Sequence, residues 1–241
     1  MSHFSRFEAK PASEVLKWVL DAYGDEFAIA TSFQKEGMVI VDLASRLAPR
    51  VRAFTLDTGR LPEETHAMIE TVRNRYGISV EVVCPDPSEV EAMVSERGPN
   101  LFYGSVPARL MCCDVRKVRP LERKLRELRA WATGMRRSQA ETRAGIPKVE
   151  CADGRIKVNP LADWSAAQVD QYTRENHVPV HPLYASGYTS IGCAPCTRAV
   201  GAGEDSRAGR WWWEEHAKKE CGIHFAADGS FERAILTKSD V

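Results

Sequence analysis

The amino-acid sequence predicts an α/β fold, a parallel β-sheet with helices on both faces. In the first half of the chain, short apolar runs recur, and amphipathic stretches separate them. Strands that alternate with helices in this way are typical of parallel sheets, because each helix returns the chain to the edge at which the next strand begins. Ligands of such sheets bind at the carboxyl ends of the strands, so the loops there are the first places to search for a site.

The expected elements follow from local patterns. In order, they are a helix over residues 13–23, a strand over 27–30, a helix over 38–47, a strand over 51–56, a helix over 63–76 and a strand over 78–83. Further on we expect a strand over 130–134, and a helix from Ser165 to about Asn176 because Ser165 and Gln168 form a capping box. Residues 181–203 are rich in Gly, Pro and Cys and predict loop, and 211–220 predict a helix.

Length and composition fit one large domain with an extension. For the 241 residues we expect an α/β domain over 1–205 and a C-terminal segment over 206–241 with a mobile tail. No apolar run approaches the ~18–20 residues of a membrane span, and residues 1–6 do not resemble a signal peptide. Seven cysteines, an odd number, do not fit a secreted disulfide scaffold. A cytoplasmic location without a membrane partner is the expectation.

The cysteine pattern points to a metal. Cys112 and Cys113 are adjacent, and Cys193 and Cys196 form a C-x-x-C pair about eighty residues later. Neighbouring Cα atoms are ~3.8 Å apart, closer than the ~4.4–6.8 Å of a normal disulfide. An iron–sulfur cluster, a structural zinc ion and redox-active or inert thiols are the three readings that this spacing leaves open. A thioredoxin-like dithiol at Cys193–Cys196 would leave the vicinal pair unexplained.

The charge of the chain is balanced overall but uneven locally. Lys plus Arg and Asp plus Glu both number 33, which argues against a general binder of nucleic acid. Between Arg109 and Arg129, however, eight basic residues face three acidic ones. This excess suits either a small anionic ligand or an ordinary solvated helix face.

Two loops follow the first two predicted strands. Residues 31–37 end at a helix N-terminus, whose amides and dipole favour an anion, although the sequence is not a Walker A motif. In the second loop, Asp57 either binds a ribose hydroxyl or caps the next helix.

The remaining cysteines divide into one candidate nucleophile and two inert thiols. Cys221 lies between Lys218-Lys219 and His224, cationic neighbours that favour the thiolate. No other cysteine is near it in the sequence, so redox chemistry there would need a resolving thiol from another protein. Cys84 and Cys151 adjoin apolar segments, and we expect them to be core or inert.

Together these segments resemble the assimilatory adenylyl-sulfate and phosphoadenylyl-sulfate reductases, almost from end to end. The stretches that carry the resemblance include Thr31-Ser32-Phe33, Leu56-Asp57-Thr58-Gly59-Arg60, Cys112-Cys113-Asp114-Val115-Arg116-Lys117, Thr133-Gly134-Met135-Arg136-Arg137, Gly192-Cys193 and Glu220-Cys221-Gly222-Ile223-His224. The resemblance implies a fold like that of the PP-loop adenine nucleotide α-hydrolases. The loop over 31–37 departs from the S-G-G-x-D-S of the ATP-cleaving relatives, which fits a member that does not split ATP.

The resemblance also implies an activity and a site. The Cys221 thiolate would attack adenosine 5′-phosphosulfate, and thioredoxin or a glutaredoxin-like dithiol would release sulfite, for cysteine biosynthesis. Cys112, Cys113, Cys193 and Cys196 would hold one 4Fe–4S cluster, in a member of the family that uses the substrate without a 3′-phosphate. The remaining assigned residues would bind substrate: Thr31, Ser32, Phe33, Leu56, Asp57, Thr58, Gly59, Lys117, Gly134, Arg136, Arg137, Arg143, Arg207, Arg210 and His224.

Other functions are weighed against this one. The first alternative is a reductase of 3′-phosphoadenosine 5′-phosphosulfate, or an enzyme that accepts both nucleotides. Its site would differ from that of an adenosine 5′-phosphosulfate reductase only near the ribose. A PP-loop tRNA-thiolating enzyme would need the ATP-cleaving loop and an RNA-binding extension, for which the balanced charge gives no support. A non-catalytic protein with a structural zinc ion would be colourless, whereas a 4Fe–4S protein absorbs broadly near ~400 nm.

Overall fold

The structure, a computed structural model, describes residues 4–214, 224–225 and 231–232. It divides into two compact units. Unit 1 comprises Met1–Thr55, Glu63–Glu81 and Leu125–Pro182, and unit 2 comprises Leu56–Pro62, Val82–Lys124 and Leu183–Val241. Both units are discontinuous in sequence. The predicted boundary at 205/206 stays a prediction, because most of the segment after it lies outside the described residues.

A six-stranded sheet has the order β3-β2-β1-β4-β6-β5. Its strands are β1 (Phe27–Ala30), β2 (Ala53–Leu56), β3 (Val80–Val83), β4 (Ala130–Ala132), β5 (Val149–Ala152) and β6 (Arg155–Val158). β1 pairs in parallel with β2 and β4, and β4 with β6, whereas β5 closes the edge as the antiparallel arm of a hairpin. The mostly parallel α/β fold is therefore confirmed, but the sequence analysis missed the β5–β6 hairpin.

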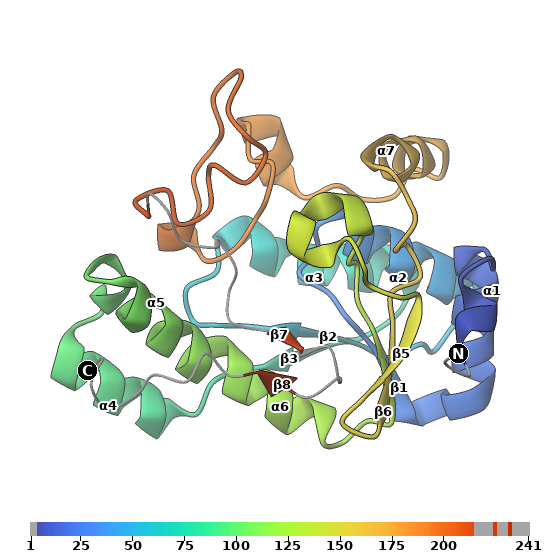
Figure 1. Ribbon diagram of the computed structural model, residues 1–241, viewed down its shortest axis with the longest axis horizontal. Helices are drawn as coiled ribbons and strands as arrows, with labels where there is room; N and C mark the ends of the chain where they lie inside the picture. Colours follow the sequence, from blue (N-terminus) through green and yellow to red (C-terminus); the bar gives the residue numbers. More distant parts are fainter. Residues whose placement is uncertain (1–3, 215–223, 226–230, 233–241) are drawn as a thin grey trace. The chain divides into compact units, whose positions relative to one another are not determined.

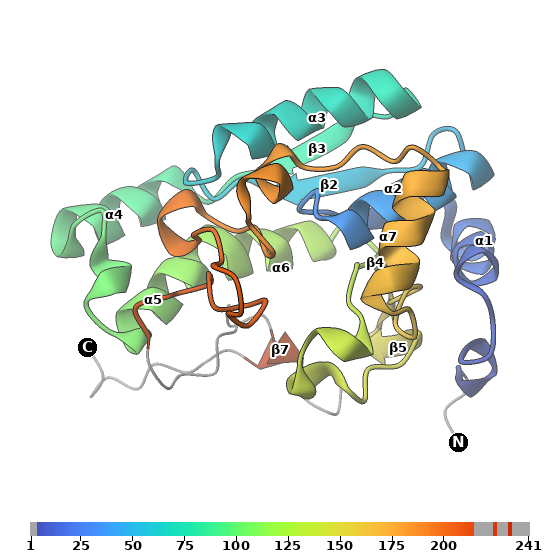
Figure 2. The same cartoon turned by 90° about the horizontal axis from the view of Figure 1, so that it is seen from above.

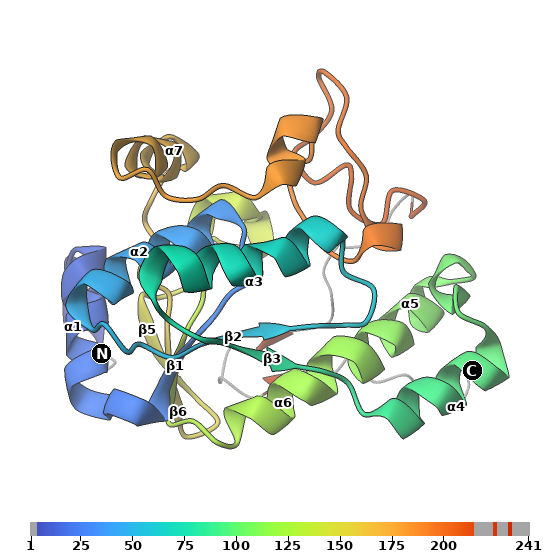
Figure 3. The same ribbon diagram turned by 180° about the vertical axis from the view of Figure 1, so that it is seen from behind.

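The α-helices described in unit 1 are α1 (Ala12–Tyr23), α2 (Lys35–Leu47), α3 (Glu63–Tyr76) and α7 (Ala166–Glu175). α1 and α2 contact strands of the sheet, and α7 packs on α2. Figures 1 and 3 show α2 and α3 on the same face of the sheet, and Figure 2 shows α7 beside α2. Ser165 caps α7, since its side chain accepts from the Gln168 amide at 3.2 Å and the Gln168 side chain accepts from the Ser165 amide at 2.8 Å. The predicted capping box is confirmed.

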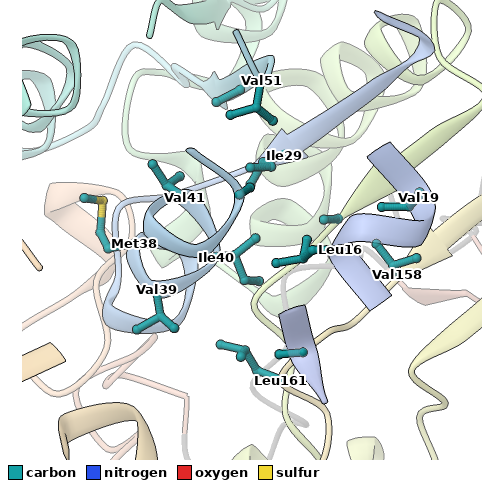
Figure 4. Packing of buried hydrophobic residues seen from close by; sticks show 14 of the residues in the cluster. Leu16, Val19, Ile29, Met38, Val39, Ile40, Val41, Val51, Val158 and Leu161 are labelled. Atoms are coloured by element: carbon teal, nitrogen blue, oxygen red, sulfur yellow. The ribbon is translucent and has the colours of Figure 1, made fainter. Parts of the chain in front are cut away.

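The core of unit 1 forms between the central strands and the apolar stripes of α1 and α2. Leu16 and Val19 of α1 meet Ile40 of α2 and Ile29 of β1, and all four side chains are fully buried (Figure 4). A central parallel strand is covered on both faces, which is why β1 reads as an unbroken apolar run instead of an alternating one. This core supports the loops that follow β1 and β4.

Unit 2 contains a helical segment that the sequence analysis did not resolve into elements. It consists of α4 (Pro87–Arg97), α5 (Val106–Cys113), a π-helical turn η4 (Asp114–Val118) and α6 (Arg119–Leu125). Asp86 caps α4 through the Ser88 and Glu89 amides, and Ser105 caps α5 through the Ala108 amide. Both helices have proline in the first turn, where no intrahelical amide bond is lost.

One local prediction is wrong, and a second is wrong in part. Trp211–Trp213 form a turn instead of opening a helix, because Trp211 has a left-handed φ of 41°; residues 215–220 of that predicted helix lie outside the described residues. Cys84 and Cys151 are exposed, which contradicts a place in the core; that they are inert stays a prediction. Cys84 follows the end of β3, and Cys151 lies on β5, the edge strand of the sheet among the described residues.

In the part of the chain that the structure describes, no helix combines the length and the apolar character needed to cross a bilayer.

Candidate functional site

One helical face in unit 2 carries both cysteines of the vicinal pair together with three cations. Arg109, Cys112, Cys113, Arg116 and Lys117 are spaced i, i+3, i+4, i+7 and i+8, which places them along one stripe of a helix. All five line the same pocket. The stripe continues into the π-helical turn η4, and such turns are frequent at functional sites. Arg109 and Arg116 are buried, so the reading of this basic region as a solvated face is wrong for both.

The C-x-x-C pair reaches the same pocket from a loop. Ala194–Cys196 form a single 3₁₀ turn, closed by a bond from the Cys196 amide to the Cys193 carbonyl at 3.0 Å. The Ala194 amide donates to the Arg60 carbonyl at 2.8 Å, which joins this turn to the loop after β2. All four cysteines named from the sequence thus line one pocket.

The loop after β2 also contributes to the pocket. The Thr58 hydroxyl is 3.2 Å from the Cys193 sulfur, and Arg116 Nη1 donates to the Thr58 carbonyl at 2.7 Å. Asp57 accepts from the Gly59 amide at 2.8 Å, so its carboxylate stabilises the turn of its own loop. Gly59 has a φ of 69°, and a Cβ there would lie 3.3 Å from Arg116 Nη1. The close approach of this loop to the cysteines was not anticipated.

Burial raises the pKa of two of the thiols in this pocket. Desolvation, and then the neighbouring Cys193 and Cys112, raise the pKa of Cys196 to about 12; Arg210 and Lys117 act in the opposite direction. Desolvation likewise raises the pKa of Cys112, against the charge of Arg116.

The pocket contains buried donors that lack an acceptor. Among the described residues, neither Arg210 Nε nor Trp211 Nε1 has a hydrogen-bond partner, although both atoms are buried and both residues line the pocket. The Arg210 guanidinium also lies against Gly192, where a Cβ would approach its Nη2 to 2.6 Å. Unpaired buried donors are costly, so they point to a bound group with acceptor atoms.

These features fit a 4Fe–4S cluster. Such a cluster takes one thiolate per iron, and four cysteines line the pocket. Its sulfur atoms accept hydrogen bonds, and its negative charge suits the cations on the wall. Among the described side chains, no group of three or more His, Cys, Asp or Glu is arranged to hold a metal ion.

Three residues of unit 2 that were assigned to the substrate, Lys117, Arg207 and Arg210, differ in their placement. Arg210 lines the cysteine pocket and donates to Ser190 Oγ and the Ile191 carbonyl at 3.3 Å each. Arg207 lies in the preceding loop, where its amide donates to Asp205 at 2.8 Å, and it is not part of the pocket lining. Lys117 lines the pocket. Of these three residues, Lys117 and Arg210 therefore line the same pocket as the cysteines, and Arg207 does not.

In unit 1, the loop after β1 is held by a local hydrogen bond and by a buried aromatic side chain. Thr31 Oγ1 accepts from the Phe33 amide at 3.0 Å, and Phe33 is fully buried with a φ of 57°. Ser32 is exposed. Gly134, after β4, packs on the first turn of α2, and a Cβ there would lie 2.8 Å from that of Glu36.

The three arginines of unit 1 that were assigned to the substrate have partners within that unit. Arg136 pairs with Glu36 at 2.9 Å and is largely buried. Arg137 pairs with Glu8 and donates to the Ile146 carbonyl at 2.9 Å. Arg143 donates to Gln139 Oε1 at 2.7 Å. Their assignment to the substrate stays a prediction.

The predicted nucleophile, Cys221, lies outside the described residues. His224 opens the short strand β7 (His224–Phe225), which pairs with β8 (Phe231–Glu232). Leu56 is the last residue of β2.

A comparison with protein families gives a match over residues 26–199 to the phosphoadenosine phosphosulfate reductase domain. The chain belongs to this family. Its relatives include the adenosine 5′-phosphosulfate reductase of Allochromatium vinosum, which is 50% identical over 202 residues, 83% of this chain and 79% of that protein. The chloroplastic 5′-adenylylsulfate reductase 3 of Arabidopsis thaliana is 43% identical over 230 residues, 91% of this chain and 50% of that protein.

Solved structures agree on the fold. The phosphoadenylyl-sulfate reductase of Candida auris, in a phosphate complex, superposes with a TM-score of 0.68 at 28% identity, over 81% of this chain and 96% of that one. The FMN adenylyltransferase of Candida glabrata superposes with a TM-score of 0.55 at 15% identity, over 95% of this chain and 79% of that one, which supports the fold alone.

Proposed function

We propose that this chain reduces adenosine 5′-phosphosulfate to sulfite and AMP, in the assimilation of sulfate for cysteine biosynthesis. The observation that carries the proposal is the 50% identity, over most of both chains, to a protein named as an adenosine 5′-phosphosulfate reductase. The pocket of unit 2 supports it, because cations and an unpaired N–H donor beside the cysteines suit an anionic substrate or cofactor.

In the proposed reaction, the Cys221 thiolate attacks the sulfur of the sulfate group. The bond from that sulfur to the phosphate oxygen breaks, and AMP leaves with the electron pair, so Cys221 becomes S-sulfocysteine. One thiol of an external dithiol, thioredoxin or a glutaredoxin-like protein, then attacks the Cys221 sulfur and releases sulfite. The second thiol of that dithiol displaces Cys221, which restores the thiolate. We expect this chemistry in the cytoplasm, where thiols stay reduced.

We further propose that Cys112, Cys113, Cys193 and Cys196 hold one 4Fe–4S cluster. When bound, the cluster supplies a rigid anionic centre that joins the helical face of α5 to the loop over 193–196. Lys117 and Arg210 balance that charge and contribute their own to the phosphosulfate. The purified protein should contain about four iron atoms per chain and absorb broadly near ~400 nm; a colourless zinc protein would contradict the cluster.

The decisive assay measures sulfite formed from adenosine 5′-phosphosulfate with thioredoxin supplied. Cys221→Ser should retain nucleotide binding and lose sulfite release, since the nucleophile is gone but the pocket is intact. Normal turnover by this variant would refute the assigned nucleophile.

A second substrate is tested in the same assay. The family takes its name from the 3′-phosphorylated nucleotide, and the Candida auris neighbour is a reductase of that compound. Sulfite production from the two nucleotides at equal concentration therefore decides whether the chain accepts one or both.

A further inference from the structure

A buried ion pair joins helix α5 to Glu214, the last residue of the continuous stretch that the structure describes. Arg109 Nε donates to Glu214 Oε1 at 2.9 Å, and Nη2 donates to Oε2 at 3.0 Å. The two side chains are only 1% and 4% exposed. Two parallel bonds between planar groups fix orientation as well as distance, and buried ions of this kind depend on each other because neither is solvated. Glu214 therefore has one defined place on the helix that carries the vicinal cysteines.

Trp211 reinforces this attachment. Its buried ring lies near the guanidinium groups of Arg109 and Arg210, whose central carbons are each 4.6 Å from the ring centroid. The Trp211 amide donates to the Cys196 carbonyl at 3.1 Å. Its φ of 41° is unfavourable for a bulky residue and persists only where the surroundings enforce it. Residues 211–214 are thus held against both cysteine segments.

The place of Glu214 limits where the nucleophile can be. Cys221 is seven residues further along the chain. Because an extended chain spans at most ~3.3–3.6 Å per residue, Cys221 lies within about 25 Å of Glu214 in any conformation. A reactive group on a short tether has a local concentration set by the anchor of the tether, so displacing the anchor lowers the rate of attack.

We propose that Arg109 is a positioning residue, which acts through Glu214. The Arg109–Glu214 pair fixes Glu214, seven residues before Cys221 in the sequence, against helix α5. The inference rests on the proposed function, in which Cys221 attacks the bound substrate. It assigns no contact with substrate to either member of the pair.

A matched control exists in the same unit. Arg198 and Glu204 also form a two-bond pair, at 2.7 and 2.8 Å, but both side chains are substantially exposed. Glu204 Oε2 also accepts a hydrogen bond from the Gly201 amide, so this pair stabilises its own loop. Losing one carboxylate charge there should leave the position of Cys221 unchanged.

The test uses the full-length, iron-loaded protein in single turnover without reductant. Arg109→Lys and Glu214→Gln should form the Cys221 sulfo adduct, followed by mass spectrometry, about tenfold more slowly than the parent. AMP affinity, iron content and the visible spectrum should stay within about twofold of the parent, which a general folding defect would not allow. Glu214→Asp, which keeps the charge, should recover part of the rate, and Glu204→Gln should match the parent.

The outcomes are separable. Adduct formation at the parent rate in both Arg109→Lys and Glu214→Gln would overturn the positioning role. Parallel loss of iron and AMP affinity in both variants would also overturn it, since the pair would then support only the fold. If the parent itself forms no adduct on Cys221, the proposed function fails and this inference fails with it.

Discussion

The basic side chains of this chain serve two different purposes, which their partners reveal. Arg136 and Arg137 neutralise carboxylates inside unit 1. Arg116, Lys117 and Arg210 instead line the cysteine pocket of unit 2, where the charges of Lys117 and Arg210 lower the pKa of Cys196 against the effect of burial. A local count of charges cannot separate these roles, because it does not record which acid each base will meet.

A buried histidine predicts how stability depends on pH. His181 is 1% exposed, and its Nε2 lies 3.0 Å from the Thr65 hydroxyl. Burial lowers its pKa below the ordinary ~6.5. Below pH ~6.5, His181 therefore binds a proton more readily in the unfolded chain than in the folded one. The free energy of unfolding should decrease as the pH falls through this range. Urea titrations between pH 7.5 and 5.5 measure this decrease.

The control for this prediction is His181→Gln, because glutamine does not titrate and so removes the titrating group at residue 181. Its unfolding free energy should depend less on pH than that of the parent over the same range. Equal slopes for the two proteins would show that another group is responsible.

Among the elements, the helix from α5 into η4 decides the site, because its stripe of cysteines and cations faces one pocket. The spacing of Arg109, Cys112, Cys113, Arg116 and Lys117 was visible in the sequence and is the signal that could have revealed this face. It was missed because polar stripes normally face solvent, and only packing shows that this one does not.

The contact between Gly134 and α2 predicts a stability effect. A Cβ at residue 134 would lie 2.8 Å from the Glu36 Cβ and 3.0 Å from the Gly37 amide nitrogen, and backbone cannot easily give way. Gly134→Ala should therefore lower the free energy of unfolding by about 1–3 kcal/mol. Thermal or urea unfolding measures it.

Gly145→Ala is the matched control, because a Cβ there meets nothing within 4 Å. It should be neutral or stabilise by up to about 1 kcal/mol, as the unfolded chain loses freedom. Similar losses for both variants would mean that the close approach at Gly134 is not the cause.

At the scale of the whole molecule, all four proposed cluster ligands belong to unit 2. Removing iron with an anaerobic chelator should accelerate amide hydrogen exchange in residues 106–118 and 187–197, since these segments lose their common anchor. Strands β1 and β4, which belong to the core of unit 1, should change little. Equal acceleration throughout the chain would contradict the confinement of the cluster to unit 2.

The sequence by itself determined the α/β class, the strands β1 to β4, the family and the candidate cysteines. These depend on local periodicity and on short motifs, which can be read from residues that are close together in the sequence. Tertiary structure decided that Cys112, Cys113, Cys193 and Cys196 line one pocket, that Thr58 lies against Cys193, and that Arg109 is paired with Glu214. Such contacts join residues far apart in sequence, and their energy comes from burial and pairing that only the folded chain provides.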